Sequence, residues 1–189
     1  MMTEVYYRVV VDPKAIDRWY LGAPFDSEGG EVDPRDFTQG KVTGWNASLV
    51  VRLRKTGRQI DFNFADFDMV VVDRRLSPIL REFSGTSLQL LHSTVDGTKN
   101  AYDIVNVCDL VDCIDESSSQ YLKWSSADGR PEKIGQYRMI TSLRIDPSRA
   151  SGHHLFRLVG WPVALIVSGE LKAALEASGV SGVSFSRVS

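Results

Sequence analysis

The sequence predicts an α+β fold, in which one compact domain spans residues 1–189 and a largely antiparallel sheet is joined by two or three short helices. Apolar runs of strand length recur along the chain, whereas few segments have helical spacing. Hairpin-like turns, not regular β-helix-β alternation, connect these runs. The length suits a single domain, and no internal repeat or change in composition divides it.

The first 44 residues predict a strand, a short helix and a loop. Glu4–Val11 is a strand that Asp12-Pro13 ends, because proline lacks a donor for the ladder. Ala15–Leu21 has apolar residues at helical spacing, and Gly22-Ala23-Pro24 stops this short helix. Phe25–Gly44 is glycine-rich and acidic, which predicts a long functional or mobile loop.

The next segment predicts a hairpin followed by a buried strand. Ser48–Arg54 and Arg58–Phe64 alternate in polarity around Lys55-Thr56-Gly57, a spacing typical of a bulged hairpin turn. The apolar run Phe67–Asp73 then predicts a strand buried in the sheet.

A helix is predicted after this strand. Ser77 is its expected N-cap, Pro78 takes the first helical position, and Gly85 closes it. Ser87–Leu91 is the following strand, and Asp96-Gly97 forms a turn.

The stretch Ala101–Ser119 is the one around which we expect the fold to be organised. It begins as a strand that is at least half buried and ends in short polar residues typical of a turn. It contains no lysine or arginine and five acids: Asp103, Asp109, Asp112, Asp115 and Glu116. These acids are either solvated or part of a face for a basic partner.

The last third predicts a loop, four strands and the clearest helix. Tyr121–Pro131 is the loop. The predicted helix is Gly169–Ser178, with Ser168 as N-cap and Gly179 as its left-handed end. The predicted strands are Tyr137–Ile145, His153–Leu158, Pro162–Val167 and Val183–Val188.

Charge and composition exclude several classes of protein. The net charge of −2 argues against a general nucleic-acid binder, although residues 1–130 carry 15 Lys and Arg against 20 Asp and Glu. No apolar run reaches the roughly 18 residues that a membrane-spanning helix needs. Met1–Val5 lacks a signal-peptide pattern. Cys108 and Cys113 have a spacing that disfavours a disulfide, so two free thiols predict a cytoplasmic location.

No motif assigns a catalytic, cofactor-binding or metal-binding residue. Paired zinc ligands and glycine-rich phosphate loops are missing from the sequence, and Gly179-Val180-Ser181-Gly182-Val183 fits a helix end better than a nucleophile elbow. A small hydrolase or transferase would need Cys108 or Cys113 beside a histidine, or Asp66 and Asp68 on one face of a strand. A non-catalytic assembly module is the third class. Neither alternative has a supporting motif.

Tryptophans supply candidate contacts. Trp161 precedes an apolar run and predicts a core position, whereas Trp45 and Trp124 lie in polar surroundings that suit an interface anchor.

An ordered series of short matches resembles one family. The series comprises Trp19-Tyr20-Leu21-Gly22 with Pro24, Tyr102 with Asn106-Val107, Val111–Asp115 with Ser118, His154–Arg157, and a C-terminal signature from Ile166 to Phe185. The chain is similar to the Imm11 immunity-protein family, found beside toxins in bacterial polymorphic toxin systems. The resemblance implies a non-catalytic cytoplasmic protein for bacterial competition, without a cofactor, that binds and neutralises a cognate toxin.

Acidic side chains and two tryptophans are the expected toxin contacts. If the toxin is a nuclease, its basic nucleic-acid groove would be attracted to an acidic face. The candidates are Asp26, Glu28, Glu31, Asp66, Asp68, Asp112, Asp115, Glu116, Trp45 and Trp124.

Overall fold

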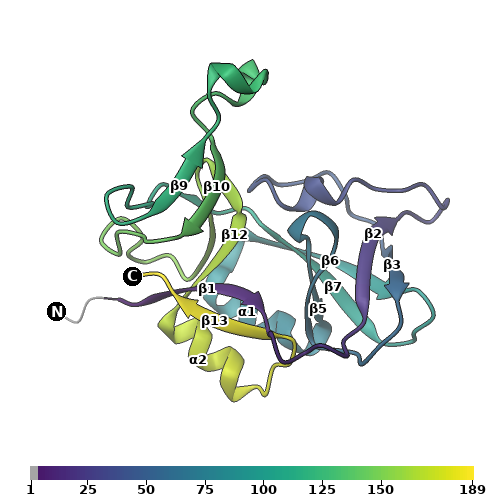
Figure 1. Ribbon diagram of the computed structural model, residues 1–189. Helices are drawn as coiled ribbons and strands as arrows, with labels where there is room; N and C mark the ends of the chain where they lie inside the picture. Colours follow the sequence, from purple (N-terminus) through teal and green to yellow (C-terminus); the bar gives the residue numbers. More distant parts are fainter. Residues whose placement is uncertain (1–3) are drawn as a thin grey trace.

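The computed structural model describes residues 4–189 and confirms the α+β class. Met1–Thr3, the start of the segment without a signal-peptide pattern, lie outside the described residues. Two larger sheets pack against each other beside two α-helices, and a two-stranded arm projects from this body (Figure 1). Within residues 4–189, no helix has the length and apolar character needed to cross a membrane.

One of the two packed sheets has five strands in the order β13-β1-β12-β11-β8. Its pairs are antiparallel except β8 with β11. The strands are β1 (Tyr6–Val11), β8 (Leu110–Val111), β11 (Leu155–Leu158), β12 (Trp161–Ser168) and β13 (Val183–Arg187).

The other packed sheet has six strands in the order β2-β3-β6-β7-β5-β4, and β3 with β6 is its parallel pair. Strand β7 lies between β5 and β6 and is buried from its second residue to its last, which confirms the predicted strand in Ala101–Ser119. The strands are β2 (Tyr20–Phe25), β3 (Leu49–Lys55), β4 (Phe62–Phe64), β5 (Val70–Asp73), β6 (Leu88–Val95) and β7 (Ala101–Val107).

An apolar core lies between the two sheets and extends under both helices. Valines from β5 and β7 meet leucines from β11 and β12, and Leu171 and Leu175 of α2 (Gly169–Ala177) complete this core. Helix α2 is confirmed: the Ser168 hydroxyl accepts a hydrogen bond from the Leu171 amide at 3.2 Å, and Gly179 has a φ of +70°.

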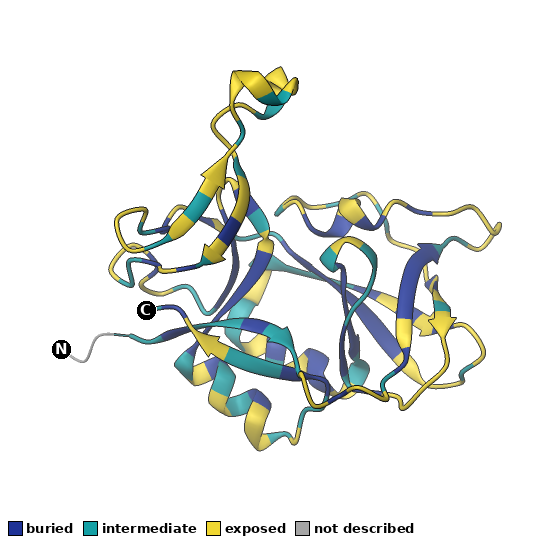
Figure 2. Cartoon of the chain, in the orientation of Figure 1, coloured by how far each residue is buried: buried dark blue, intermediate teal, exposed yellow. Residues whose placement is uncertain are grey.

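The arm is formed by β9 (Gln120–Lys123) and β10 (Tyr137–Ser142), so the predicted loop Tyr121–Pro131 begins as a strand. Figure 2 shows that burial concentrates in the packed sheets, whereas the outer part of the arm is mainly exposed. Short 3₁₀ turns connect elements at Pro34–Phe37, Asp66–Asp68, Arg74–Leu76, Gly85–Ser87, Ser126–Asp128 and Pro131–Lys133.

Two N-terminal predictions are wrong. Residues 15–21 form turns and the start of β2, and this edge strand runs through Gly22 and Pro24. Proline is tolerated at a sheet edge, and a β-carbon at Gly22 would lie 2.7 Å from the Arg54 side chain, which would have to shift. The expected hairpin is also wrong, because β3 pairs with β2 and β6, whereas β4 pairs with β5.

The start of helix α1 (Ser77–Ser84) also differs from the prediction. Ser77 is the first helical residue and not the N-cap. Its buried hydroxyl donates to the Asp103 carboxylate at 2.6 Å, and the same carboxylate accepts from Arg74 at 3.2 Å and contacts His92 at 2.8 Å. Asp103 therefore joins the first turn of α1 to the central strand β7.

We expect Asp103→Ala to lower the free energy of unfolding by about 1–3 kcal/mol, because the buried Ser77 hydroxyl loses its acceptor. Chemical denaturation measures this change. The control is His92→Ala, which removes an exposed partner of the same carboxylate and should cost less than about 0.5 kcal/mol. Equal losses in the two variants would contradict this role of Asp103.

Candidate functional site

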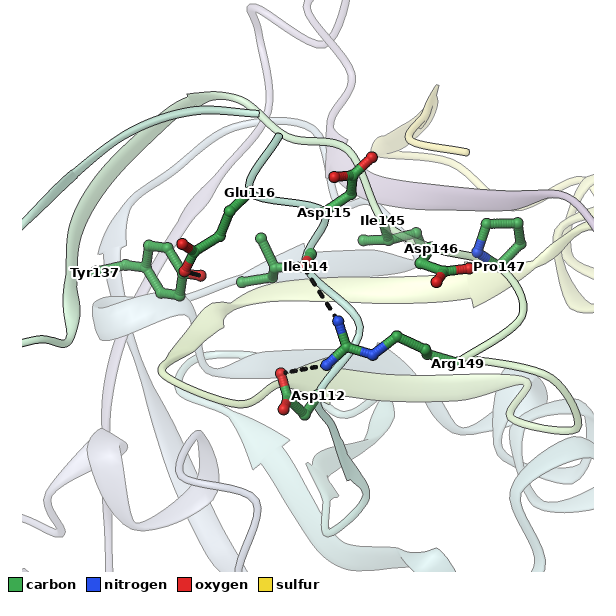
Figure 3. Close-up of a pocket in the computed structure, with 9 residues that line it drawn as sticks. All are labelled: Asp112, Ile114, Asp115, Glu116, Tyr137, Ile145, Asp146, Pro147 and Arg149. Atoms are coloured by element: carbon green, nitrogen blue, oxygen red, sulfur yellow. Dashed lines mark hydrogen bonds and ion pairs between the residues drawn. The ribbon is translucent and has the colours of Figure 1, made fainter. Parts of the chain in front are cut away.

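An acidic groove lies where the arm joins the body (Figure 3). Its volume is about 660 Å³, and four carboxylates and one arginine line it together with a tyrosine and three apolar residues. The lining residues are Asp112, Ile114, Asp115, Glu116, Tyr137, Ile145, Asp146, Pro147 and Arg149. We call this feature the acidic groove.

Two similar turns form the floor of the acidic groove. Ile114 and Ile145 pair in an antiparallel bridge, so Asp115 lies opposite Arg144 and Asp146 lies opposite Cys113, and both aspartates line the groove from either side of the bridge. Asp115 accepts hydrogen bonds from the Ser117 amide and hydroxyl at 3.0 and 2.6 Å. These bonds lower the pKa of Asp115, and the carboxylate remains ionised at neutral pH.

Asp146 repeats this arrangement. It accepts from the Ser148 hydroxyl and amide at 2.6 and 2.9 Å, and these hydrogen bonds lower its pKa. Asp112 instead pairs with the Arg149 guanidinium at 3.0 Å, and Arg149 also donates to the Ile114 carbonyl at 3.4 Å (Figure 3). The groove thus holds a net excess of negative charge on turns of fixed geometry.

Glu116 connects the acidic groove to the arm. Its carboxylate accepts hydrogen bonds from Lys123, from the Tyr137 hydroxyl and, at 2.9 Å, from the Tyr121 hydroxyl. The Lys123 ammonium and the two phenols lower the pKa of Glu116 to about 2. The rings of Tyr121 and Tyr137 meet edge to face with centroids 5.3 Å apart, and both pack on the core beneath.

The outer face of the arm exposes apolar side chains. Leu122 and Met139 are cross-strand neighbours and are 55% and 46% exposed. Trp124 is half-buried because Lys133 and Arg138 lie over its ring, with the charged groups 5.2 and 4.9 Å from the centroid.

The predicted contact residues fall into separate groups. The acidic groove brings together Asp112, Asp115 and Glu116, and Trp124 lies on the adjoining arm. Trp45 packs against the core and donates from its indole nitrogen to Asp36 at 3.3 Å.

The remaining acids lie on two other segments. Asp26, Glu28 and Glu31 occupy the loop after β2, where the Asp26 carboxylate accepts from the amides of Glu28 and Gly30. Asp66 and Asp68 do not share a strand face as expected, because they lie in the turn between β4 and β5. Asp66 pairs with Arg54, whereas Asp68 lines a separate small cavity.

The cysteines and histidines do not form a nucleophile–base pair. Burial raises the pKa of the Cys113 thiol to about 12, and such a thiol is a poor nucleophile at neutral pH. The partners of the histidines lie elsewhere: His92 contacts Asp103, His153 contacts Asp109 at 2.7 Å, and His154 contacts the Ser168 hydroxyl at 2.9 Å. In the described part of the chain, no group of three or more His, Cys, Asp or Glu could hold a metal ion.

The model of the Imm11 immunity protein family matches residues 31–189. The chain belongs to this family. The matched residues of this Imm11 protein include the whole acidic groove and the arm. Trp19–Pro24, which belong to the series of short matches in the sequence, precede the matched part. Members of the Imm11 family are typically non-catalytic immunity proteins. No curated protein matches the sequence.

Sequence reasoning missed the residues that the second half of the Imm11 chain adds to the acidic groove. Tyr137, Asp146 and Arg149 come from segments far from Ala101–Ser119 in sequence. A usable signal was present, since Asp-x-Ser occurs after an isoleucine at both 114–117 and 145–148. That repetition indicates two equivalent turns but does not reveal that both line one groove.

We expect Glu116→Gln to remove part of the acid sensitivity of this Imm11 protein. The folded-state pKa of Glu116 is depressed from 4.5 to about 2, so its contribution is complete above about pH 4.5 and is lost as pH falls towards 2. Thermal unfolding from pH 5 to pH 2 should therefore show a smaller decline in melting temperature for the variant. Glu132→Gln, on the outer part of the arm, is the control and should follow the wild-type profile.

Proposed function

We propose that this chain is a cytoplasmic immunity protein that neutralises its cognate toxin by binding it, with the acidic groove as a principal contact. Membership of the Imm11 family is the observation that carries the functional class. The location of the contact is supported by the acidic groove, in which Asp115, Glu116 and Asp146 have lowered pKa values and stay charged.

Charge complementarity indicates the kind of toxin surface that fits. Four carboxylates face one arginine in the acidic groove, so a lysine- or arginine-rich protrusion would be attracted to it. A toxin that binds nucleic acid, such as a nuclease, carries a surface of this kind. Occupation of that surface by the immunity protein would exclude the nucleic acid and would also speed association.

The first test of this function is co-purification with the toxin encoded beside the protein. We expect a stoichiometric complex and loss of toxicity when both proteins are present in one cell. A toxin that stays active and does not bind the full-length chain would refute the proposed function.

The location of the contact is tested by matched neutralisation. The groove variant combines Asp112→Asn, Asp115→Asn and Asp146→Asn, because asparagine retains an oxygen that can accept the turn hydrogen bonds. We expect the affinity for the toxin to fall at least ~10-fold and to depend less on salt. Isothermal calorimetry across a salt titration measures both effects.

The control changes the net charge equally, with Asp26→Asn, Glu28→Gln and Glu31→Gln in the loop after β2. This loop is the alternative location of an acidic contact. If the loop variant loses affinity and the groove variant keeps it, the contact lies at the loop. Unchanged affinity in both variants would show that neither acidic segment contributes.

A further inference from the structure

The turn between β4 and β5 has an unusual backbone for its sequence. Phe67 and Asp68 have φ values of +54° and +58°, and they are the non-glycine residues with positive φ in the part of the chain that the structure describes. Successive positive φ values are typical of hairpin turns built from asparagine and glycine. Phenylalanine at the first of these positions costs free energy, because its β-carbon crowds the backbone, whereas aspartate tolerates the left-handed region better.

The residues on either side of Phe67 have partners within the protein. The Asp66 carboxylate pairs with Arg54, and the Asp66 carbonyl accepts from the Met69 amide at 3.2 Å. The Asp68 carbonyl accepts from the buried guanidinium of Arg157 at 3.2 Å. The Asp68 side chain lines a cavity of about 160 Å³. Internal contacts thus hold the turn in its strained conformation.

The Phe67 side chain has no comparable internal role. It is 60% exposed, and the guanidinium of Arg35 lies over its ring, 4.8 Å from the centroid. Arg35 also pairs with Asp33 at 2.9 Å, just as Arg54 pairs with Asp66. The ring is therefore presented from a rigid turn whose neighbouring charges are already compensated.

We infer that Phe67 is an anchor residue that inserts into an apolar pocket of the cognate toxin. Strained backbone in a well-supported turn is typical of functional positions, and aromatic side chains are enriched at the centres of protein interfaces. Because Arg35 and Asp66 already have ionic partners, the surroundings of Phe67 fit an apolar pocket of the toxin better than a charged one. This inference rests on the proposed function and adds a second contact to the acidic groove.

Phe67→Asn tests the inference, because asparagine tolerates positive φ and lacks the ring. We expect the melting temperature to rise by roughly 2–4 °C as strain is relieved. We expect the affinity for the purified toxin to fall at least ~10-fold. Ile16→Asn is the matched control, since Ile16 is an apolar residue with 83% exposure outside the regular strands, and its replacement should leave affinity unchanged.

The outcomes separate this inference from the proposed function. Wild-type affinity in Phe67→Asn would overturn the anchor role while leaving toxin binding intact, whereas a wild-type chain that fails to bind toxin would overturn the function itself. A large fall in melting temperature would show that Phe67 is structural. Self-association of the wild type that Phe67→Asn abolishes, with toxin affinity retained, would assign the ring to a second copy instead.

Discussion

The contact on which the arrangement of the two packed sheets depends is the buried guanidinium of Arg157. Arg157 lies on β11 with no exposed surface and donates to the Pro162 carbonyl at 2.6 Å and to the Asp68 carbonyl at 3.2 Å. One side chain thus joins the five-stranded sheet to the β4–β5 turn of the six-stranded sheet. Burial lowers its pKa to about 10, so it remains charged at neutral pH and needs compensation nearby.

The Asp68 carboxylate attracts this guanidinium and so compensates its charge. The pair of Arg157 and Asp68 also helps to position both proposed contacts, Phe67 and the acidic groove. Burial raises the pKa of the Asp68 carboxyl, while Arg157 and Arg8 oppose this shift. The turn that presents Phe67 is therefore held by the electrostatics of the interior. On the same strand, the Arg157 amide donates to the Asp109 carbonyl at 2.9 Å, and this bond positions β8 immediately before Asp112 of the acidic groove.

Local signals account for the part of the fold that the sequence could predict. Helix α2 has a serine cap, apolar periodicity and a terminal glycine, and β7 contains the β-branched residues Ile104, Val105 and Val107, so both were predictable from adjacent residues. The segment Ala15–Leu21 was not, because the bridge from Arg18 to Arg58 and the pairing of Tyr20 and Leu21 with β3 override its helical spacing. Parallel pairing of β3 with β6 similarly joins segments that no short-range pattern connects.

The acidic groove illustrates the same limit for a functional site. The turn chemistry of Asp115 could be read from Asp-x-Ser, whereas the Ile114–Ile145 bridge, which brings the segment of Asp146 to the same groove, could not. Hydrogen bonds from serine fix both carboxylates before any partner arrives, and Glu116 is fixed by three donors. Because these side chains are already ordered, binding loses little conformational entropy at the acidic groove. The same argument applies to Phe67. Its strained backbone holds the ring outward, and the free-energy cost of that strain arises during folding and not during association.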